Sequence, residues 1–182
     1  MTNVRIKLKN VRLSFPSLFK KATFEGVETK YEATFIIDKS DKKTIEAIKA
    51  EINNLIEEGK VRLPKDRICF KDGDLMDSEY NAGSYLLKAS NKTRPTVLNR
   101  NTSPIVEEDD IIYGGCYVNA IVSFWYLSRP SNRRICCNLH GVQFAKDGER
   151  FGDAPVTADD FDDISNDDDG SSDGSYDDVV GF

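Results

Sequence analysis

Apolar and polar residues alternate along several short segments of this chain, which is the pattern of half-buried β-strands. The alternation is clearest over Tyr31–Ile37 and Cys116–Leu127, where every second side chain is apolar. Tyr85–Ala89 and Ile135–Phe144 follow the same period, the second with an irregularity expected at Gly141. These segments predict a mainly β fold.

One segment follows a helical period instead. Isoleucine and leucine recur at three- and four-residue spacing over Ile45–Ile56, and the opposite face is rich in Lys and Glu. Ser40 or Asp41 can cap the start of this helix, and Gly59 can close its end. We therefore predict one central helix with a solvated outer face.

The first strand is expected to be irregular. The apolar phase set by Ile6 and Leu8 shifts by one residue to Val11, Leu13 and Phe15, which indicates a β-bulge near Asn10. About five or six strands with one helix describe a small, mainly antiparallel β-barrel. The oligonucleotide-binding (OB) barrel is one such architecture, and periodicity alone does not separate it from other small barrels and sandwiches.

The charge of the chain is divided between two regions. Gly152–Phe182 contains eleven aspartates and no Lys, Arg or Glu, so it carries −11. All 25 basic residues lie in Met1–Phe151 with the other 20 acidic residues, which gives 25 − 20 = +5 and a total of −6. We predict a folded domain over 1–151 and a flexible acidic tail over 152–182, because the tail cannot bury enough apolar surface to order itself.

Catalytic and metal chemistry fit the sequence poorly. His140 is the single histidine, and no Gly-rich phosphate loop with a following Lys-Ser or Lys-Thr occurs. Asp72, Asp74, Asp77 and Glu79 are close together, but their spacing departs from a calcium-binding loop and is more typical of a turn. We expect no enzyme activity, no metal and no cofactor.

The sequence also points to a cytoplasmic location. No apolar run reaches the roughly 18–20 residues of a membrane span, and the start of the chain leads directly into a strand pattern rather than a signal peptide. We therefore expect no membrane partner. The four cysteines lack CxxC spacing, so we expect them to be reduced, structural thiols.

A body with net positive charge suggests a polyanionic ligand. Binding of a single nucleic-acid strand needs cations for phosphates and exposed aromatic rings for bases. Tyr117 and Trp125 share the more polar face of their strand, and Phe15, Phe19 and Phe24 interleave with Lys20 and Lys21. We expect most of the aromatic residues to lie in the core, and any single one other than Tyr117 and Trp125 to be a core residue rather than a contact. The predicted DNA-binding residues are Lys7, Lys20, Lys21, Lys88, Lys92, Arg94, Arg100, Tyr117, Trp125, Arg129, Arg133 and Arg134.

The last residues of the tail form a distinctive motif. Asp177-Asp178-Val179-Val180-Gly181-Phe182 resembles the C-terminal tail of bacterial and phage single-stranded DNA-binding proteins. In those proteins a pocket on a partner takes the Phe ring, and basic residues take the carboxylates. The resemblance implies a partner-binding role for Asp177, Asp178, Val179, Val180 and Phe182, although Gly181 stands where the bacterial pattern usually has Pro.

The body is also similar to a family of tailed-phage single-stranded DNA-binding proteins with an OB-type barrel, from about Lys7 to Phe161. The shared fragments are Val11–Pro16, Tyr31–Ile37, Asp72–Asp74, Ala89–Pro95, Tyr113–Gly115 and Ala158–Phe161. The resemblance implies a non-enzymatic, sequence-independent protein of phage replication, recombination or repair in the host cytoplasm. A polymerase, helicase or nuclease would be recruited by the tail.

Two other functions fit the same sequence, and a third, a metal-dependent nuclease that uses the Asp72–Glu79 carboxylates, fits it least well. A strand-annealing recombination protein would bind DNA and also speed the pairing of complementary strands. An acidic DNA mimic would use its tail against a DNA-binding enzyme, and its body would have no affinity for nucleic acid. A monomer and a homodimer are both compatible with the sequence.

Overall fold

A computed structural model describes residues 4–75, 81–152 and 158–166 of the chain. Two compact units are present, Met1–Gly152 and Asp153–Phe182, and each is considered by itself. In the second unit the described residues form one short 3-10 helix, η5 (Ala158–Asp160). Among the described residues, no helix has the length and apolar character needed to cross a membrane.

The first unit is built on a seven-stranded sheet in the order β5-β6-β4-β1-β8-β9-β7. Its strands are β1 (Arg5–Ser17), β4 (Tyr31–Asp38), β5 (Phe70–Asp72), β6 (Ser84–Asn91), β7 (Thr96–Leu98), β8 (Tyr117–Arg129) and β9 (Asn132–Lys146). A separate hairpin consists of β2 (Thr23–Phe24) and β3 (Val27–Glu28). Short 3-10 helices η1 (Lys65–Arg67), η2 (Gly73–Leu75) and η4 (Glu107–Asp109) lie between strands.

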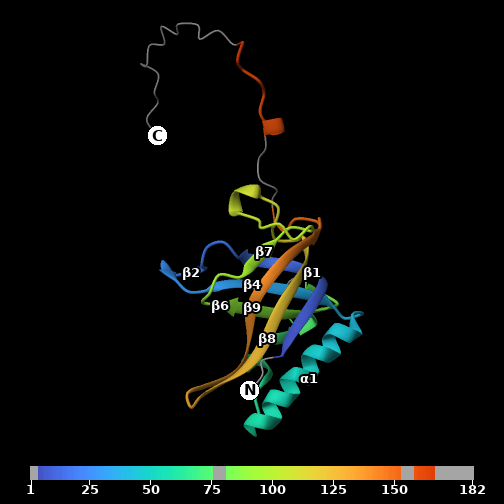
Figure 1. Cartoon of the computed structure of the whole chain (residues 1–182), viewed down its shortest axis with the longest axis vertical. Coiled ribbons are helices and arrows are strands. Elements are labelled where there is room, and N and C mark those ends of the chain that lie inside the picture. Colours follow the sequence, from blue (N-terminus) through green and yellow to red (C-terminus); the bar gives the residue numbers. More distant parts are fainter. Residues whose placement is uncertain (1–3, 76–80, 153–157, 167–182) are drawn as a thin grey trace, which may run out of the picture. The chain divides into compact units, whose positions relative to one another are not determined.

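Five of these strands close into a barrel (Figure 1). β6 pairs with β4 on one side and meets β9 on the other through Ser90 and Asn138, so the ring runs β1-β4-β6-β9-β8 and back to β1. The predicted OB-like barrel with one helix is confirmed. The prediction of antiparallel pairing is incomplete, because β6 and β9 run parallel where they meet.

A short segment before β5 separates part of β6 from β9. Ile68 bridges Ile135 of β9, and the N–H of Cys69 donates to the carbonyl of Ile135 at 3.2 Å. On the other side, the N–H of Lys88 on β6 donates to the carbonyl of Cys69 at 3.1 Å. The two strands therefore meet directly only beyond this insertion, at Ser90 and Asn138.

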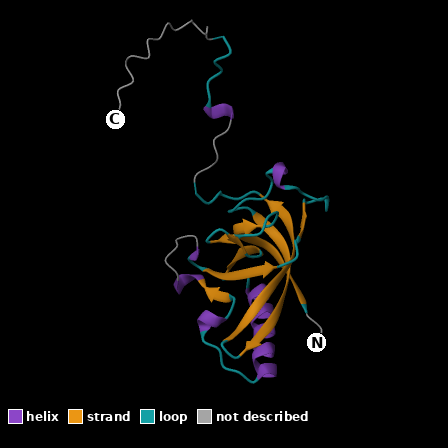
Figure 2. Ribbon diagram, turned by 90° about the vertical axis from the view of Figure 1, so that its left-hand side faces the viewer, coloured by secondary structure: helices purple, strands orange, loops and turns teal. Residues whose placement is uncertain are grey.

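The helix α1 (Lys42–Gly59) covers one end of the barrel, beside β1 and β8 (Figure 1; Figure 2). Asp41 is its N-cap, as predicted, and accepts a hydrogen bond from the N–H of Thr44 at 3.4 Å. Gly59 is the last helical residue, and Lys60 takes the left-handed conformation with φ 50°. A Cβ on Gly59 would lie 3.1 Å from the ring of Tyr126, so glycine lets the helix end pack against β8.

The core follows the predicted alternation. Inward-facing residues of every barrel strand join three isoleucines of α1 in one buried cluster, which includes Leu8, Leu13, Phe35, Leu87, Val118, Phe124, Leu139, Ile45, Ile48 and Ile52. Cys136 and Cys137 point to opposite faces of β9, and Cys137 is buried in the core. All four cysteines are free thiols.

β1 contains two irregularities. The pairing with β8 shifts between Leu8 and Val11, and Asn10 has φ 51°, which confirms the predicted bulge. A second shift, in the pairing with β4, lies between Ser14 and Ser17. The expected core position of Phe15 is wrong, because this bulge leaves its side chain 82% exposed. In β9 one bulge residue is His140, next to the predicted Gly141, and the pairing with β8 shifts again at Ala145.

Candidate functional site

A row of polar side chains crosses the outer face of all five barrel strands. Ser123 on β8 lies opposite Asn138 on β9, which is beside Ser90 on β6. Ser90 lies opposite Glu32 on β4, and Glu32 opposite Ser17 on β1. Paired residues point to the same face of a sheet, and the flanking residues Ala33, Ala89, Cys137 and Leu139 are buried inside. We call the row Ser123–Asn138–Ser90–Glu32–Ser17 the outer band; Ser123 is buried, with 1% exposed, and the other four residues are half-buried.

Trp125 stands at the β8 end of the outer band. Its Nε1–H donates a hydrogen bond to Oδ1 of Asn138 at 3.1 Å, so the orientation of the half-buried indole is fixed by the band itself. Ser123 Oγ and His140 Nε2 share a hydrogen bond of 2.7 Å. Burial, and then the charge of Arg5, lowers the pKa of His140, so this ring is neutral at neutral pH.

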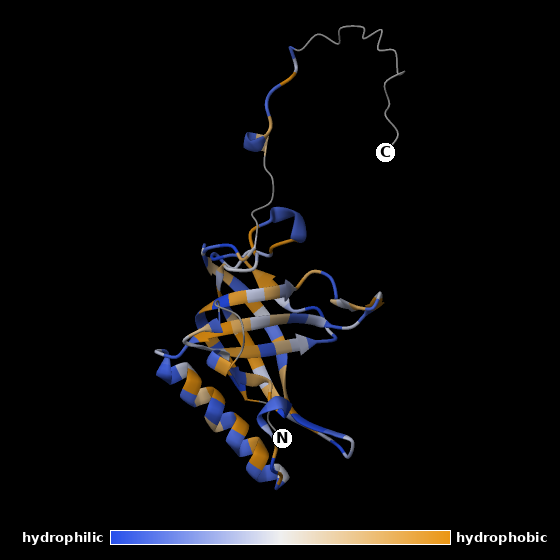
Figure 3. Ribbon diagram, turned by 180° about the vertical axis from the view of Figure 1, so that it is seen from behind, coloured by the Kyte–Doolittle hydropathy of each residue, from blue (hydrophilic) through white to orange (hydrophobic). Residues whose placement is uncertain are grey.

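The β8–β9 hairpin supplies cations along one edge of the outer band. Figure 3 shows it as a hydrophilic projection at the same end of the barrel as α1. Asn132 accepts hydrogen bonds from Arg67 at 3.2 Å and from Arg134 at 2.8 Å, and Arg129 and Arg133 are exposed beside it. Within residues 4–75, 81–152 and 158–166, none of these arginines forms an ion pair with a carboxylate.

The opposite edge carries a second group of cations, because the β1–β4 and β6–β7 connections both lie there. The guanidinium of Arg94 lies 5.8 Å from the ring centroid of Phe19. Lys92 is exposed, Lys21 is half-buried, and Lys20 lies 3.4 Å from Glu107. The outer band thus lies between two groups of positive charge that are far apart in the sequence.

Two further predicted cations lie on strands of the band. Lys88 projects from β6 next to Ser90, and its Nζ lies 3.7 Å from a carboxylate oxygen of Glu32. Lys7 on β1 lies opposite Ile121 of β8. Ile121 is the neighbouring residue of β8 that points to the same face as Ser123. Both lysines can reach a ligand that lies across the outer face.

Tyr117 and Arg100 lie away from these groups. Tyr117 is eight residues from Trp125 on β8, about 27 Å along the strand, and its ring packs under the charges of Arg12 at 6.0 Å and Lys146 at 4.7 Å. The carbonyl of Arg100 accepts a hydrogen bond from Gln143 at 3.2 Å. Their predicted role in binding stays a prediction, as does that of Asp177, Asp178, Val179, Val180 and Phe182, which lie outside the described residues.

Sequence reasoning missed Arg67 and Asn138. Asn138 could have been found, because it takes the outward phase between Cys137 and Leu139. Arg67 gives no such signal, since it is 65 residues from Asn132 and is joined to the hairpin only by folding.

The acidic segment after β5 has a structural role in its described part. Lys39 Nζ lies 2.8 Å from Asp72 and 2.6 Å from Asp74, and these contacts lower the pKa of both carboxyl groups. Asp74 also accepts a hydrogen bond from the N–H of Gly83 at 2.7 Å. These carboxylates therefore hold a turn, as predicted, while Asp77 and Glu79 lie outside the described residues.

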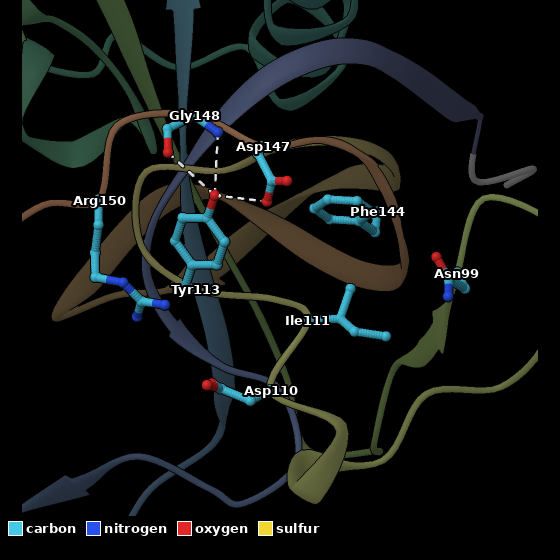
Figure 4. A pocket seen from close by; sticks show the side chains of 8 residues that line it. All are labelled: Asn99, Asp110, Ile111, Tyr113, Phe144, Asp147, Gly148 and Arg150. Atoms are coloured by element: carbon cyan, nitrogen blue, oxygen red, sulfur yellow. Dashed lines mark hydrogen bonds between the residues drawn. The ribbon is translucent and has the colours of Figure 1, made fainter. Parts of the chain in front are cut away.

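A pocket of about 620 Å³ lies elsewhere on the barrel unit and shares no residue with the outer band (Figure 4). It is lined by Asn99, Asp110, Ile111, Tyr113, Phe144, Asp147, Gly148 and Arg150. The hydroxyl of Tyr113 donates to Asp147 at 2.8 Å, and the guanidinium of Arg150 lies 4.3 Å from the Tyr113 ring centroid. Within the pocket, Tyr113, Asp147 and Gly148 are thus bonded to one another.

Comparisons with known proteins identify related phage proteins. A family model described as the Enterobacter phage Enc34 ssDNA-binding protein matches residues 4–171. A curated relative, putative protein p50 of Acyrthosiphon pisum secondary endosymbiont phage 1, is 41% identical over 175 residues, which cover 89% of this chain and 95% of the relative.

Two solved structures share the fold. The single-stranded DNA-binding protein from bacteriophage Enc34, in complex with ssDNA, is 32% identical with a TM-score of 0.75, over 81% of this chain and 89% of that one. Gp2.5, a single-stranded DNA-binding protein encoded by bacteriophage T7, has a TM-score of 0.58 over 86% of this chain and 99% of that one. Its identity is 11%, so the likeness concerns the fold alone.

Proposed function

The chain belongs to the family of the Enterobacter phage Enc34 ssDNA-binding protein, as its sequence resemblance predicted, and we propose that it binds single-stranded DNA without regard to sequence. One observation carries the proposal. Trp125 is fixed by Asn138 on an outer band that lies between two groups of cations. The related Enc34 protein has been solved in complex with ssDNA.

The arrangement suits a strand laid across the barrel rather than along it. Arginines of the β8–β9 hairpin neutralise phosphates on one edge, and Lys92 and Arg94 do so on the other, with release of bound counterions. Trp125 offers a ring on which a base can stack, and the polar band can hydrogen-bond sugars and base edges. None of these contacts requires a particular base, and no chemical step is involved.

Replacement of Trp125 by alanine tests the proposal. A stacked base contributes about 1–3 kcal/mol, so we expect the variant to bind oligo-dT about 5- to 150-fold more weakly. Trp125→Phe keeps a ring and should retain most of the affinity. Anisotropy of a labelled oligo-dT measures both variants, with duplex DNA of the same length as the comparison ligand.

The proposal fails if the wild-type chain shows no preference for oligo-dT over duplex, or if Trp125→Ala binds as tightly as wild type while still folded. Circular dichroism establishes folding independently of the lost indole.

We further propose that the aspartates of the tail compete with DNA for the same cations. The tail carries −11 against +5 for the body, and the attraction acts within a Debye length of roughly 8–10 Å at ordinary salt. Deletion of Asp167–Phe182 should therefore tighten oligo-dT binding, most strongly at low salt. A salt series on both proteins measures this effect, and equal affinities at low salt would rule out the competition.

The same model assigns a second role to the tail. When DNA occupies the cations, the tail is released, and its Asp177–Phe182 segment becomes available to a replication or recombination protein of the host or phage. The proposed place of action is the host bacterial cytoplasm.

A further inference from the structure

Phe15 combines two properties that oppose folding. Its side chain is 82% exposed, although phenylalanine gains stability from burial. Its backbone has φ 46°, a conformation in which bulky residues are outliers and which glycine or asparagine adopts readily. An exposed aromatic ring on a strained backbone contributes nothing evident to the barrel.

The bulge itself has a structural cause, but this cause does not require phenylalanine. Phe15 and Pro16 together lie opposite Ala33, between the pairs Ser14–Thr34 and Ser17–Glu32. Pro16 has no N–H to offer the ladder, and such residues are placed at bulges. The bulge needs Pro16 and a neighbour that tolerates positive φ, so a small polar residue would serve the fold better at position 15.

The bulge turns Phe15 outward at the β1 end of the outer band. Ser17, the last residue of the band, is two positions away, and Lys88 lies in the adjacent row Ser14–Thr34–Lys88. Trp125 stands at the other end, on β8. The band makes four inter-strand steps of about 4.8 Å, so its end residues Ser123 and Ser17, each two positions from one of the two rings, are separated by about 19 Å along the surface.

We propose that Phe15 is a second stacking residue for the DNA strand, at the opposite end of the outer band from Trp125. The inference rests on the proposed single-stranded DNA binding. About 19 Å corresponds to at most about six nucleotides at the 3.4 Å spacing of a stacked strand, which is within the range for one OB barrel. The cations beside Phe15 favour a nucleic acid over an apolar protein surface as its occupant.

Three variants at this position separate the ring from the backbone. Phe15→Asn relieves the positive φ and removes the ring, so it should fold at least as stably as wild type while binding oligo-dT about 5- to 150-fold more weakly. Phe15→Leu keeps an apolar side chain without a π-face and should also lose affinity, whereas Phe15→Tyr should retain it. Urea unfolding followed by Trp125 fluorescence gives the stability, and anisotropy gives the affinity.

The results distinguish this inference from the proposed function. If wild type fails to bind oligo-dT, both fail. If wild type binds and Trp125→Ala weakens binding but Phe15→Asn does not, the role of Phe15 alone is wrong. If Phe15→Asn leaves DNA affinity unchanged but abolishes self-association in sedimentation, Phe15 contacts a second copy and the stacking role is overturned.

The fluorescence of an indole at position 15 can test stacking directly, without relying on a loss of affinity. In a Phe15→Trp, Trp125→Phe chain the single indole reports from position 15. Saturation with oligo-dT should quench its fluorescence, as expected for an indole stacked on a base. Unchanged emission, when anisotropy shows that the oligonucleotide is bound, would contradict the inference.

Discussion

Replacement of Arg129, Arg133 and Arg134 together by glutamine should weaken oligo-dT binding about 100- to 1,000-fold at about 50 mM salt. Each phosphate contact on a single strand contributes about 0.7 to the slope of log K against log salt, so three lost contacts lower the slope by about two. The number three assigns one phosphate to each arginine, and Arg133 must reach round the hairpin to make its contact, because it pairs with Ser128 and points to the face opposite Arg129 and Arg134. The arginines of the hairpin have no carboxylate partners among the described residues, and Asn132 already holds Arg134 in place.

A second triple variant controls for net charge. Lys42, Lys43 and Lys49 are exposed on α1, away from the β8–β9 hairpin, and their replacement by glutamine removes the same three charges. We expect a much smaller change in both affinity and slope. Equal losses in the two triple variants would mean that overall charge, and not the hairpin, determines binding.

Replacement of Phe35 by alanine should have the largest effect on folding. Phe35 is fully buried and lies between Leu13 on β1 and Leu87 on β6, so its ring contacts the neighbouring strands on both sides. Loss of a buried phenylalanine costs about 3–5 kcal/mol, a large share of the roughly 5–15 kcal/mol of a typical domain. Urea unfolding followed by Trp125 fluorescence measures the free energy of unfolding.

Thr34 provides the matched control, since it neighbours Phe35 on β4 but points to the outer face. Thr34→Ala should change the free energy of unfolding by less than about 1 kcal/mol. A loss below about 1 kcal/mol for Phe35→Ala would show that the barrel interior is less tightly packed than the buried contacts indicate.

The alternation of residues predicted which side chains face the core but not which strands meet. β4, β6, β8 and β9 were expected from their period, and the bulge near Asn10 from its phase shift. The parallel contact of Ser90 with Asn138 was not, because a periodic pattern records sidedness and carries no information on partners. β7 was missed as well, since three residues in a polar loop are too short to show a period.

Phe15 shows how the alternation of buried and exposed residues can fail at a β-bulge. Its place in the apolar phase was read correctly, but Pro16 imposes a bulge that turns the side chain outward. The same limit applies to Tyr117 and Trp125. The alternation of side chains along β8 places both residues on one face. Only the fold shows that Trp125 lies on the outer band, whereas Tyr117 packs beside Arg12 and Lys146.

The insertion of Ile68 and Cys69 between β6 and β9 has a consequence for the direction of the hairpin. It occupies the width of one strand, about 4.8 Å, at the end of the barrel from which the β8–β9 hairpin extends. β9 is thereby separated from β6 near the β8–β9 turn, so the hairpin projects from the barrel and its tip is exposed to solvent. Since Arg67 comes directly before this insertion and bonds to Asn132, one continuous segment, Arg67–Cys69, both separates β9 from β6 and anchors the hairpin.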